Sequence, residues 1–271
     1  MTWSAVDLGI LLPPFLAGLL VLATHVPLGA QVLKKGIVFI DLAIAQIAAL
    51  GVVVAAMFEV DPHGWPIQVA AAAAALAGAL MLDWAERRWP QVQEAQIGVV
   101  FVLAATAGIL LLSKNPHGGE HLRDLLAGQI LWVGYGQLVV PLVATVVLVA
   151  AWFGLAARLS ARGFSLLFAL AVTVSVQLVG VYLVFASLIV PSLGARDWDE
   201  RRRLPLAYAI GIGGYALGLV LSAALDLPSG ALIVWCLALL AVVAHAAAPS
   251  REAAVRARSA AAATREVEPH S

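Results

Sequence analysis

The stretch FSLLFALAVTVSVQLVGVYLVFASLIVPSLGA, residues 164–195, is apolar along its length and carries no charged side chain. As one continuous helix it would be about 48 Å long, well beyond the roughly 30 Å of a bilayer core. It must therefore cross a membrane twice, or cross once and add a half-helix. Gly180 and Pro191 are the residues expected to interrupt it.

Seven more apolar blocks surround this stretch, and one of them, residues 125–157, is also too long for a single perpendicular helix. The other six are residues 8–28, 36–58, 66–82, 97–113, 204–224 and 229–248. Hydrophobic residues make up 62% of the 271 and charged residues 12%, against roughly 45–50% and about 25% in soluble domains. We therefore predict an all-α, polytopic transmembrane helical bundle over residues 1–248. The Ala-rich, charged residues 249–271 are expected to form a cytoplasmic, flexible tail.

The distribution of Lys and Arg decides how often the two long blocks cross, because these residues concentrate in cytoplasmic loops. If the N-terminus is outside, residues 125–157 cross once and residues 164–195 cross twice, the chain makes nine crossings. Then 14 of the 16 basic residues lie inside, whereas the reverse assignment places 12 inside and two single crossings place 6. The inside set is Lys34, Lys35, Arg87, Arg88, Arg158, Arg162, Arg196, Arg201, Arg202, Arg203, Arg251, Arg256, Arg258 and Arg265. In this arrangement the GYG at residues 134–136 would end an outer half-helix before the fifth span.

Several classes of function are disfavoured. The net charge is zero, so no basic field points to nucleic acid. The one cysteine, Cys236, rules out an internal disulfide and a multi-thiolate metal site. Neither a P-loop nor HExxH nor GxSxG occurs, and we expect no catalytic residue and no stably bound cofactor. The first residues, MTWSAVDLG, lack the basic region of a signal peptide.

Asp41 and Gln46 lie inside the apolar block GIVFIDLAIAQIAALG, residues 36–51. An ionisable side chain within a span is costly, so Asp41 is a candidate functional residue, with a structural bond to backbone or to Lys35 as the alternative. Gln46 is five positions further, about 140° around a helix, so the two side chains do not share a face. An isolated glutamine is more often an interhelical hydrogen-bonding group than a ligand, but we include Gln46 with Asp41 and Gln177 as a candidate residue of the translocation path.

The outer loop SKNPHGGEHLRDLLAG contains His117, Glu120 and His121, which are candidate residues for metal capture. The Gly pair between them disfavours a rigid helix, so a solvated loop is the favoured interpretation.

Gln177 and Ser175 are polar residues of a later span, which could line a path or satisfy each other. His25 and His245 are expected near span ends as packing or interface residues.

Three stretches, taken in order, resemble the membrane permease of zinc/manganese/iron-type ABC importers. The first is VPLGAQVLKKGIVFIDLAIAQIAALGVVVA, and the second is LLAGQILWVGYGQLVVPL. The third is VQLVGVYLVFASLIVPSLGAR, followed by LSAALDLPSGALIV, which is similar to the family's Leu-Asp-Leu-Pro-Ser-Gly ending. The chain departs from the family at two places: Gln46 stands where His is usual, and Asp41 is one residue early.

The resemblance implies a fold like that of cobalamin and siderophore importers, in a bacterial cytoplasmic membrane. It implies a second copy of the chain, two ATP-binding cassette ATPase subunits and an extracytoplasmic metal-binding protein as partners. The transported ion would be divalent, with zinc or manganese favoured. The segment AARLSARGF matches the family's ATPase-coupling position. Its coupling residues would be Ala157, Arg158, Ser160, Ala161, Arg162 and Gly163.

Two other functions remain possible from the sequence. A proton-coupled secondary transporter would use Asp41 as its protonatable group, but the inverted repeat and charges on several spans that this class displays are missing from the sequence. A membrane scaffold would use the polar outer loop and the arginine cluster at residues 196–203.

Overall fold

The computed structural model describes most of the apolar part of the chain. The described residues are 8–36, 39–58, 65–112, 126, 128, 130–155 and 161–248. The outer loop with His117, Glu120 and His121, the coupling residues Ala157, Arg158 and Ser160, and the tail at 249–271 lie outside them.

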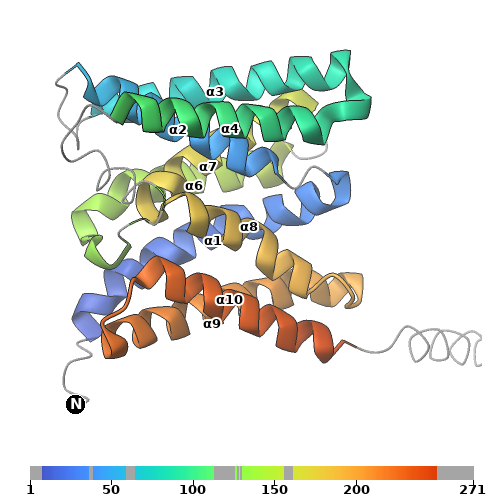
Figure 1. The fold of residues 1–271 in the computed structure, drawn as a ribbon. Helices are drawn as coiled ribbons and strands as arrows, with labels where there is room; N and C mark the ends of the chain where they lie inside the picture. The colour runs from blue at the N-terminus through green and yellow to red at the C-terminus, as the bar shows by residue number, and fades with distance from the viewer. Residues whose placement is uncertain are drawn as a thin grey trace, which may run out of the picture.

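Nine α-helices are present in the described residues, together with two short 3-10 turns (Figure 1). The helices are α1 (Leu8–Lys35), α2 (Ile40–Ala56), α3 (Trp65–Arg88), α4 (Gln93–Leu112), α6 (Tyr135–Leu155), α7 (Ala161–Val179), α8 (Val181–Gly194), α9 (Glu200–Leu225) and α10 (Ser229–Ala246). The 3-10 turns are η2 (Pro90–Val92) and η3 (Ile130–Trp132). Six helices are long and apolar enough to cross a bilayer, and α2, α7 and α8 are shorter apolar helices. The predicted all-α transmembrane bundle is confirmed.

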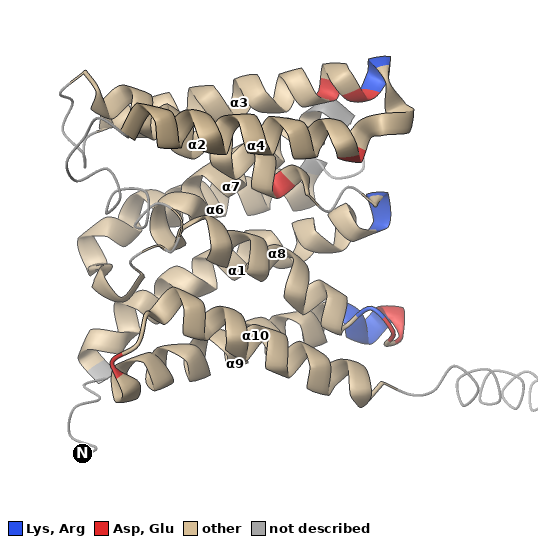
Figure 2. Cartoon of the chain, in the orientation of Figure 1, with Lys and Arg blue, Asp and Glu red and all other residues tan. Residues whose placement is uncertain are grey.

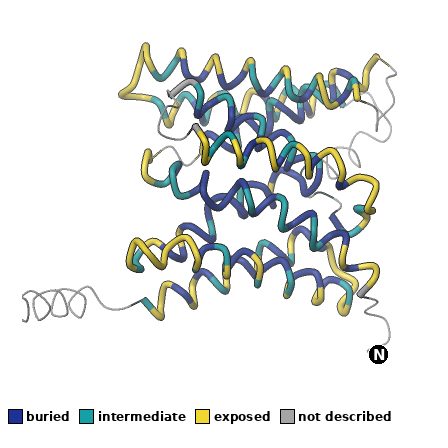
Figure 3. Tube along the Cα trace, turned by 180° about the vertical axis from the view of Figure 1, so that it is seen from behind, coloured by how far each residue is buried: buried dark blue, intermediate teal, exposed yellow. Residues whose placement is uncertain are grey.

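The helices run alternately between the two ends of the bundle, so the nine helices make nine passes (Figure 1). α2, α3 and α4 form one packed group, and α9 packs with α10 on the opposite side. Between them lie α1 and α8, which pack on each other, and α7, which packs on α3. Buried residues concentrate in this central layer, whereas the outer helices present exposed, mostly apolar side chains (Figure 3), as a lipid-facing surface requires.

The long block at 164–195 is broken at Gly180, which has φ 78° and ψ 166°, a conformation essentially confined to glycine. α7 and α8 therefore form two separate helices, as predicted. Pro191 does not interrupt the chain and lies inside α8. Gly128 packs against this break: a Cβ there would overlap the backbone carbonyl of Val179 and lie 2.7 Å from Gly180 N.

The other long block, residues 125–157, provides one long helix, α6, so the alternative in which this block crosses twice is wrong. The GYG element lies where α6 begins, at Tyr135, and the 3-10 turn η3 precedes it. Two further boundaries differ from prediction. α1 continues through Pro27 to Lys35, and α2 begins only at Ile40, because apolarity alone does not show where a helix continues past the bilayer core.

Lys and Arg side chains of the described residues gather at one end of the bundle (Figure 2). They come from the C-terminal ends of α1 and α3, the α8–α9 turn and the start of α9. The α9–α10 turn, which contains the LDLPSG element, lies at the opposite end. We call the first of these the basic end.

Close helix contacts depend on small residues, as expected where lipid offers little hydrophobic driving force between helices. Gly18 lies against the ring of Tyr215, and Gly29 lies against the carbonyl of Leu188. On the other side of the bundle, a Cβ at Gly51 would lie 2.7 Å from Ala74 Cβ and 2.9 Å from Ala70 O. These contacts hold α1 on α8 and α9, and α2 on α3.

Candidate translocation path and coupling region

Asp41 is the second residue of α2, the helix that begins on the side of the bundle toward the basic end. Its side chain is completely buried, and neither carboxylate oxygen has a hydrogen-bond partner among the described residues. A buried carboxylate without a partner is costly. The first turn of a helix favours negative charge, which offsets part of that cost but leaves both oxygens available for a ligand or a proton.

The packing of α2 explains why Asp41 is buried. α2 contacts α3 and α4 over much of its length, and it also contacts α7. The alanines of this helix permit these close contacts, and Ala43, Ile44 and Ala45, which follow Asp41, are all buried. The sequence predicts Asp41 about five residues inside the span, and in the structure it belongs to the first turn of α2.

Gln46 and Gln177 do not join Asp41 in one site. Gln46 is buried five residues further along α2, about 7.5 Å up the helix axis. Gln177 is near the C-terminal end of α7, at the end of the bundle opposite Asp41, and its Nε2 is buried without a partner in the described structure. The three residues are thus distributed along the bundle from one end to the other.

Two side chains with buried polar atoms were not singled out by the sequence as path candidates. The sequence predicts His25 near a span end, but this residue is completely buried well inside α1, because α1 extends ten residues beyond it. Its Nδ1 lies 3.0 Å from both Thr24 Oγ1 and Val21 O, and its Nε2 has no partner among the described residues. Gln96, in α4, has a buried Oε1 that is likewise unpartnered there. In the sequence, the only signal for His25 or Gln96 is a polar residue within or next to a long apolar run.

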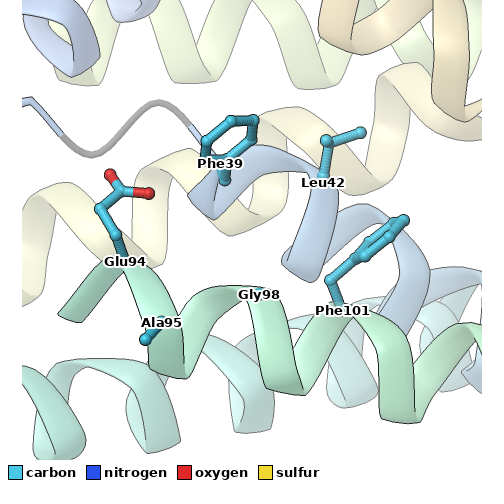
Figure 4. Close-up of a pocket in the computed structure, with 6 residues that line it drawn as sticks. All are labelled: Phe39, Leu42, Glu94, Ala95, Gly98 and Phe101. Atoms are coloured by element: carbon cyan, nitrogen blue, oxygen red, sulfur yellow. The ribbon is translucent and has the colours of Figure 1, made fainter. Parts of the chain in front are cut away.

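No three His, Cys, Asp or Glu side chains in the described ranges converge as a set of metal ligands. A hollow of about 510 Å³ lies between the starts of α2 and α4. Phe39, Leu42 and Phe101 form its walls, and the Glu94 side chain projects from α4 at its edge (Figure 4). Its lining is almost wholly apolar, so this hollow does not have the donor set of a cation site.

The expected coupling region lies between α6 and α7 at the basic end. α6 ends at Leu155, and Ala161 and Arg162 are the first residues of α7, followed by Gly163. The end of α6 and the start of α7 therefore both lie on the side of the bundle where Lys and Arg gather.

The α8–α9 turn is fastened to the end of α10 at this same end. Asp197 Oδ2 lies 2.8 Å from His245 Nδ1 and 3.3 Å from Arg196 Nε. Trp198 Nε1 donates a hydrogen bond to Ala244 O at 2.9 Å. His245 is in the last turn of α10, near the span end as predicted.

Comparison with known proteins identifies the family. The model of the ABC 3 transport family matches residues 7–159 and 149–248. The chain is 22% identical over 255 residues to the high-affinity zinc uptake system membrane protein ZnuB of Haemophilus influenzae, covering 86% of this chain and 96% of that one. It is 27% identical over 230 residues to the manganese transport system membrane protein MntC of Halalkalibacterium halodurans, covering 76% of each.

A solved structure has the same fold. PsaBC from Streptococcus pneumoniae, in complex with Fab, superimposes with a TM-score of 0.71 at 18% sequence identity, covering 90% of this chain and 92% of that one. The family match spans nearly all of the helical bundle, and the resemblance noted in the sequence is confirmed. The chain therefore belongs to the ABC 3 transport family, as a membrane-spanning permease.

Proposed function

We propose that this permease is the transmembrane subunit of an ATP-driven importer of divalent metal ions, with zinc or manganese as the transported ion. The family match and the relatives named for zinc and manganese uptake support the substrate class. The observation that carries the proposal within this chain is Asp41, a buried carboxylate with two oxygens free of hydrogen bonds in the described structure. A divalent cation passing this point would find a negatively charged oxygen ligand.

The basic end faces the cytoplasm in this proposal, with the start of α1 and the α9–α10 turn outside. The concentration of Lys and Arg at one end supports this orientation (Figure 2). Asp41 then lies near the inner mouth of the path. Gln46 would lie further along α2, and Gln177 would line the outer half.

Membership of the ABC 3 transport family supports ATPase subunits and a metal-binding protein as partners of this chain. ATPase subunits would dock on the segment between α6 and α7, at residues Ala157, Arg158, Ser160, Ala161, Arg162 and Gly163. A metal-binding protein would deliver the ion at the outer end, and His117, Glu120 and His121 would belong to an outer loop that is either solvated or able to capture metal. A second copy of the chain would complete the path, supplying ligands that the described residues of one chain do not gather. The proposal requires no stably bound cofactor in this chain.

The test is uptake of radioactive Zn²⁺ and Mn²⁺ into vesicles containing the permease with its co-purified ATPase. Asp41→Asn keeps the size of the side chain and removes its charge. We expect uptake to fall roughly ten- to hundredfold, since a contact to a charged group is worth about 1.5–3 kcal/mol. Glu94→Gln removes a charge from the exposed edge of the neighbouring hollow and is the matched control. Normal uptake by Asp41→Asn, with the ATPase bound, would remove Asp41 from the path.

A second arm separates the proposal from a proton-coupled transporter that uses Asp41 as its protonatable group. In the proposed importer, uptake requires ATP and persists when the proton gradient is collapsed. Uptake driven by a proton gradient without ATP would establish the secondary transporter instead.

A further inference from the structure

Four side chains from three helices meet beside the expected coupling segment. Lys35 Nζ lies 3.9 Å from the centroid of the Phe164 ring. The Phe164 ring stacks on Phe168, with centroids 5.7 Å apart and planes at 25°. Trp152 meets Phe164 edge-on, with centroids 5.9 Å apart and planes at 61°. Phe164 is thus the centre of a cluster that also contains Lys35, Trp152 and Phe168, which we call the aromatic joint.

The aromatic joint connects residues at the ends of α6 and α1 with residues in the first half of α7. Trp152 lies three residues before the end of α6, and Phe164 is the fourth residue of α7. They therefore flank residues 156–160 from both sides and hold the two ends of that segment together. Lys35 is the last residue of α1, and α2 begins at Ile40, one residue before Asp41.

The aromatic joint has a rigid side and an adjustable side. Phe168 is completely buried and Phe164 is 6% exposed, so their rings are fixed by the bundle core. The Lys35 side chain is exposed, and its ammonium group reaches the Phe164 ring from outside the core. Attraction between a cation and an aromatic ring is strengthened when water is partly excluded. This contact joins the end of α1 to the start of α7.

We infer that Lys35 is a positioning residue for energy coupling, holding the α1–α2 turn to the α6–α7 segment through the aromatic joint so that the two move together. This inference rests on the proposed function, in which the ATPase acts on the α6–α7 segment. A displacement of that segment would then be passed to the start of α2, where Asp41 lies. Without Lys35 the direct packing of α1 and α2 on α7 would remain, but the added link between the end of α1 and the start of α7 would be lost.

The experiment measures Zn²⁺ taken up per ATP hydrolysed in vesicles holding the complete complex. We expect Lys35→Gln to lower this ratio by roughly two- to fivefold, the change that loss of one cation–π contact produces, with ATPase binding and thermal stability retained. Lys35→Arg keeps the cation and should restore the ratio. Lys34→Gln is the matched control, because Lys34 is also exposed but lies about 100° around the helix, and its ratio should equal that of the parent chain.

An unchanged ratio in Lys35→Gln, or an equal fall in Lys34→Gln, would overturn the inference. Phe164→Leu provides a second variant, since it retains apolar bulk and Lys35 but removes the ring, and it should lower the ratio as Lys35→Gln does. A normal ratio in Phe164→Leu would equally overturn the inference. If the unmodified complex showed no ATP-dependent uptake, the proposed function would fail instead, so the two failures are distinguishable.

Discussion

Tyr215 is completely buried, and its hydroxyl group lies 2.8 Å from Ser187 Oγ, which in turn donates to Leu183 O at 2.6 Å. Such a pair satisfies its polar atoms within the bundle and has a structural role. Asp41 differs, because it is equally buried and both its oxygens lack partners among the described residues. At the scale of single residues, this difference selects Asp41 as the candidate for contact with the transported ion.

Asp197 gives a prediction about pH, since it lies in the α8–α9 turn outside the spans. Partial burial acts to raise its pKa, but the hydrogen bond and charge of Arg196, together with His245, lower the pKa below its ordinary value. The ionised form is therefore favoured in the folded protein. Its stabilising contribution is present above the ordinary Asp pKa and is lost as the pH falls through the lowered pKa.

We expect Asp197→Asn to increase hydrogen exchange in the α8–α9 turn and at the end of α10 at neutral pH. The unmodified chain should show the same loosening only in acid. Asp199→Asn is the control, because Asp199 precedes α9 without a side-chain capping bond. Equal exchange in Asp197→Asn and the unmodified chain at neutral pH would show that the Asp197–His245 contact does not hold the two segments together.

At the scale of elements, the connection between α7 and α8 is tightly constrained. One residue, Gly180, joins two helices that run in opposite directions. Its backbone conformation excludes a side chain without strain, and Gly128 packs on the same turn from a distant part of the chain. The turn is therefore determined both by local backbone freedom and by a tertiary contact.

Gly180→Ala should lower the free energy of unfolding by about 1–3 kcal/mol, the cost of holding a non-glycine residue in this region. The measurement is thermal unfolding of the purified permease in detergent. Gly154→Ala is a suitable comparison, because Gly154 lies in α6 with open space around its Cβ position, and a helical alanine there should be neutral or stabilising. A Gly180→Ala variant as stable as the parent would show that the turn can relax.

At the scale of the whole molecule, the nine alternating helices place the start of α1 and the end of α10 at opposite ends (Figure 1). The Lys and Arg residues gather at the end where α10 finishes. An odd number of passes and a basic end together predict the orientation of the chain in the membrane.

The orientation can be tested with single cysteines in a Cys236→Ala background. Leu227→Cys, in the exposed α9–α10 turn, should react with a membrane-impermeant maleimide in intact spheroplasts. Arg202→Cys, exposed at the start of α9, should react only after the membrane is opened. The reverse pattern would invert the proposed topology and move Asp41 to the outer mouth.

The sequence by itself favoured nine passes, a break near Gly180 and one basic end, because apolar length, glycine and charge act locally along the chain. The motifs spread over most of the bundle also indicated the protein family. The roles of the site residues, from Asp41 to the outer loop and the coupling segment, remain predictions.

Only the tertiary structure decided which side chains meet. It placed His25 deep inside α1, separated Gln177 from Asp41, and brought Lys35 onto the ring of Phe164. Helices of similar apolar composition can pack in many orders, since lipid and helix surfaces are alike in polarity and the choice depends on close fit between small residues. That fit, at positions such as Gly18, Gly29 and Gly128, depends on two segments at once. The sequence of one segment therefore does not show which other segment it packs against.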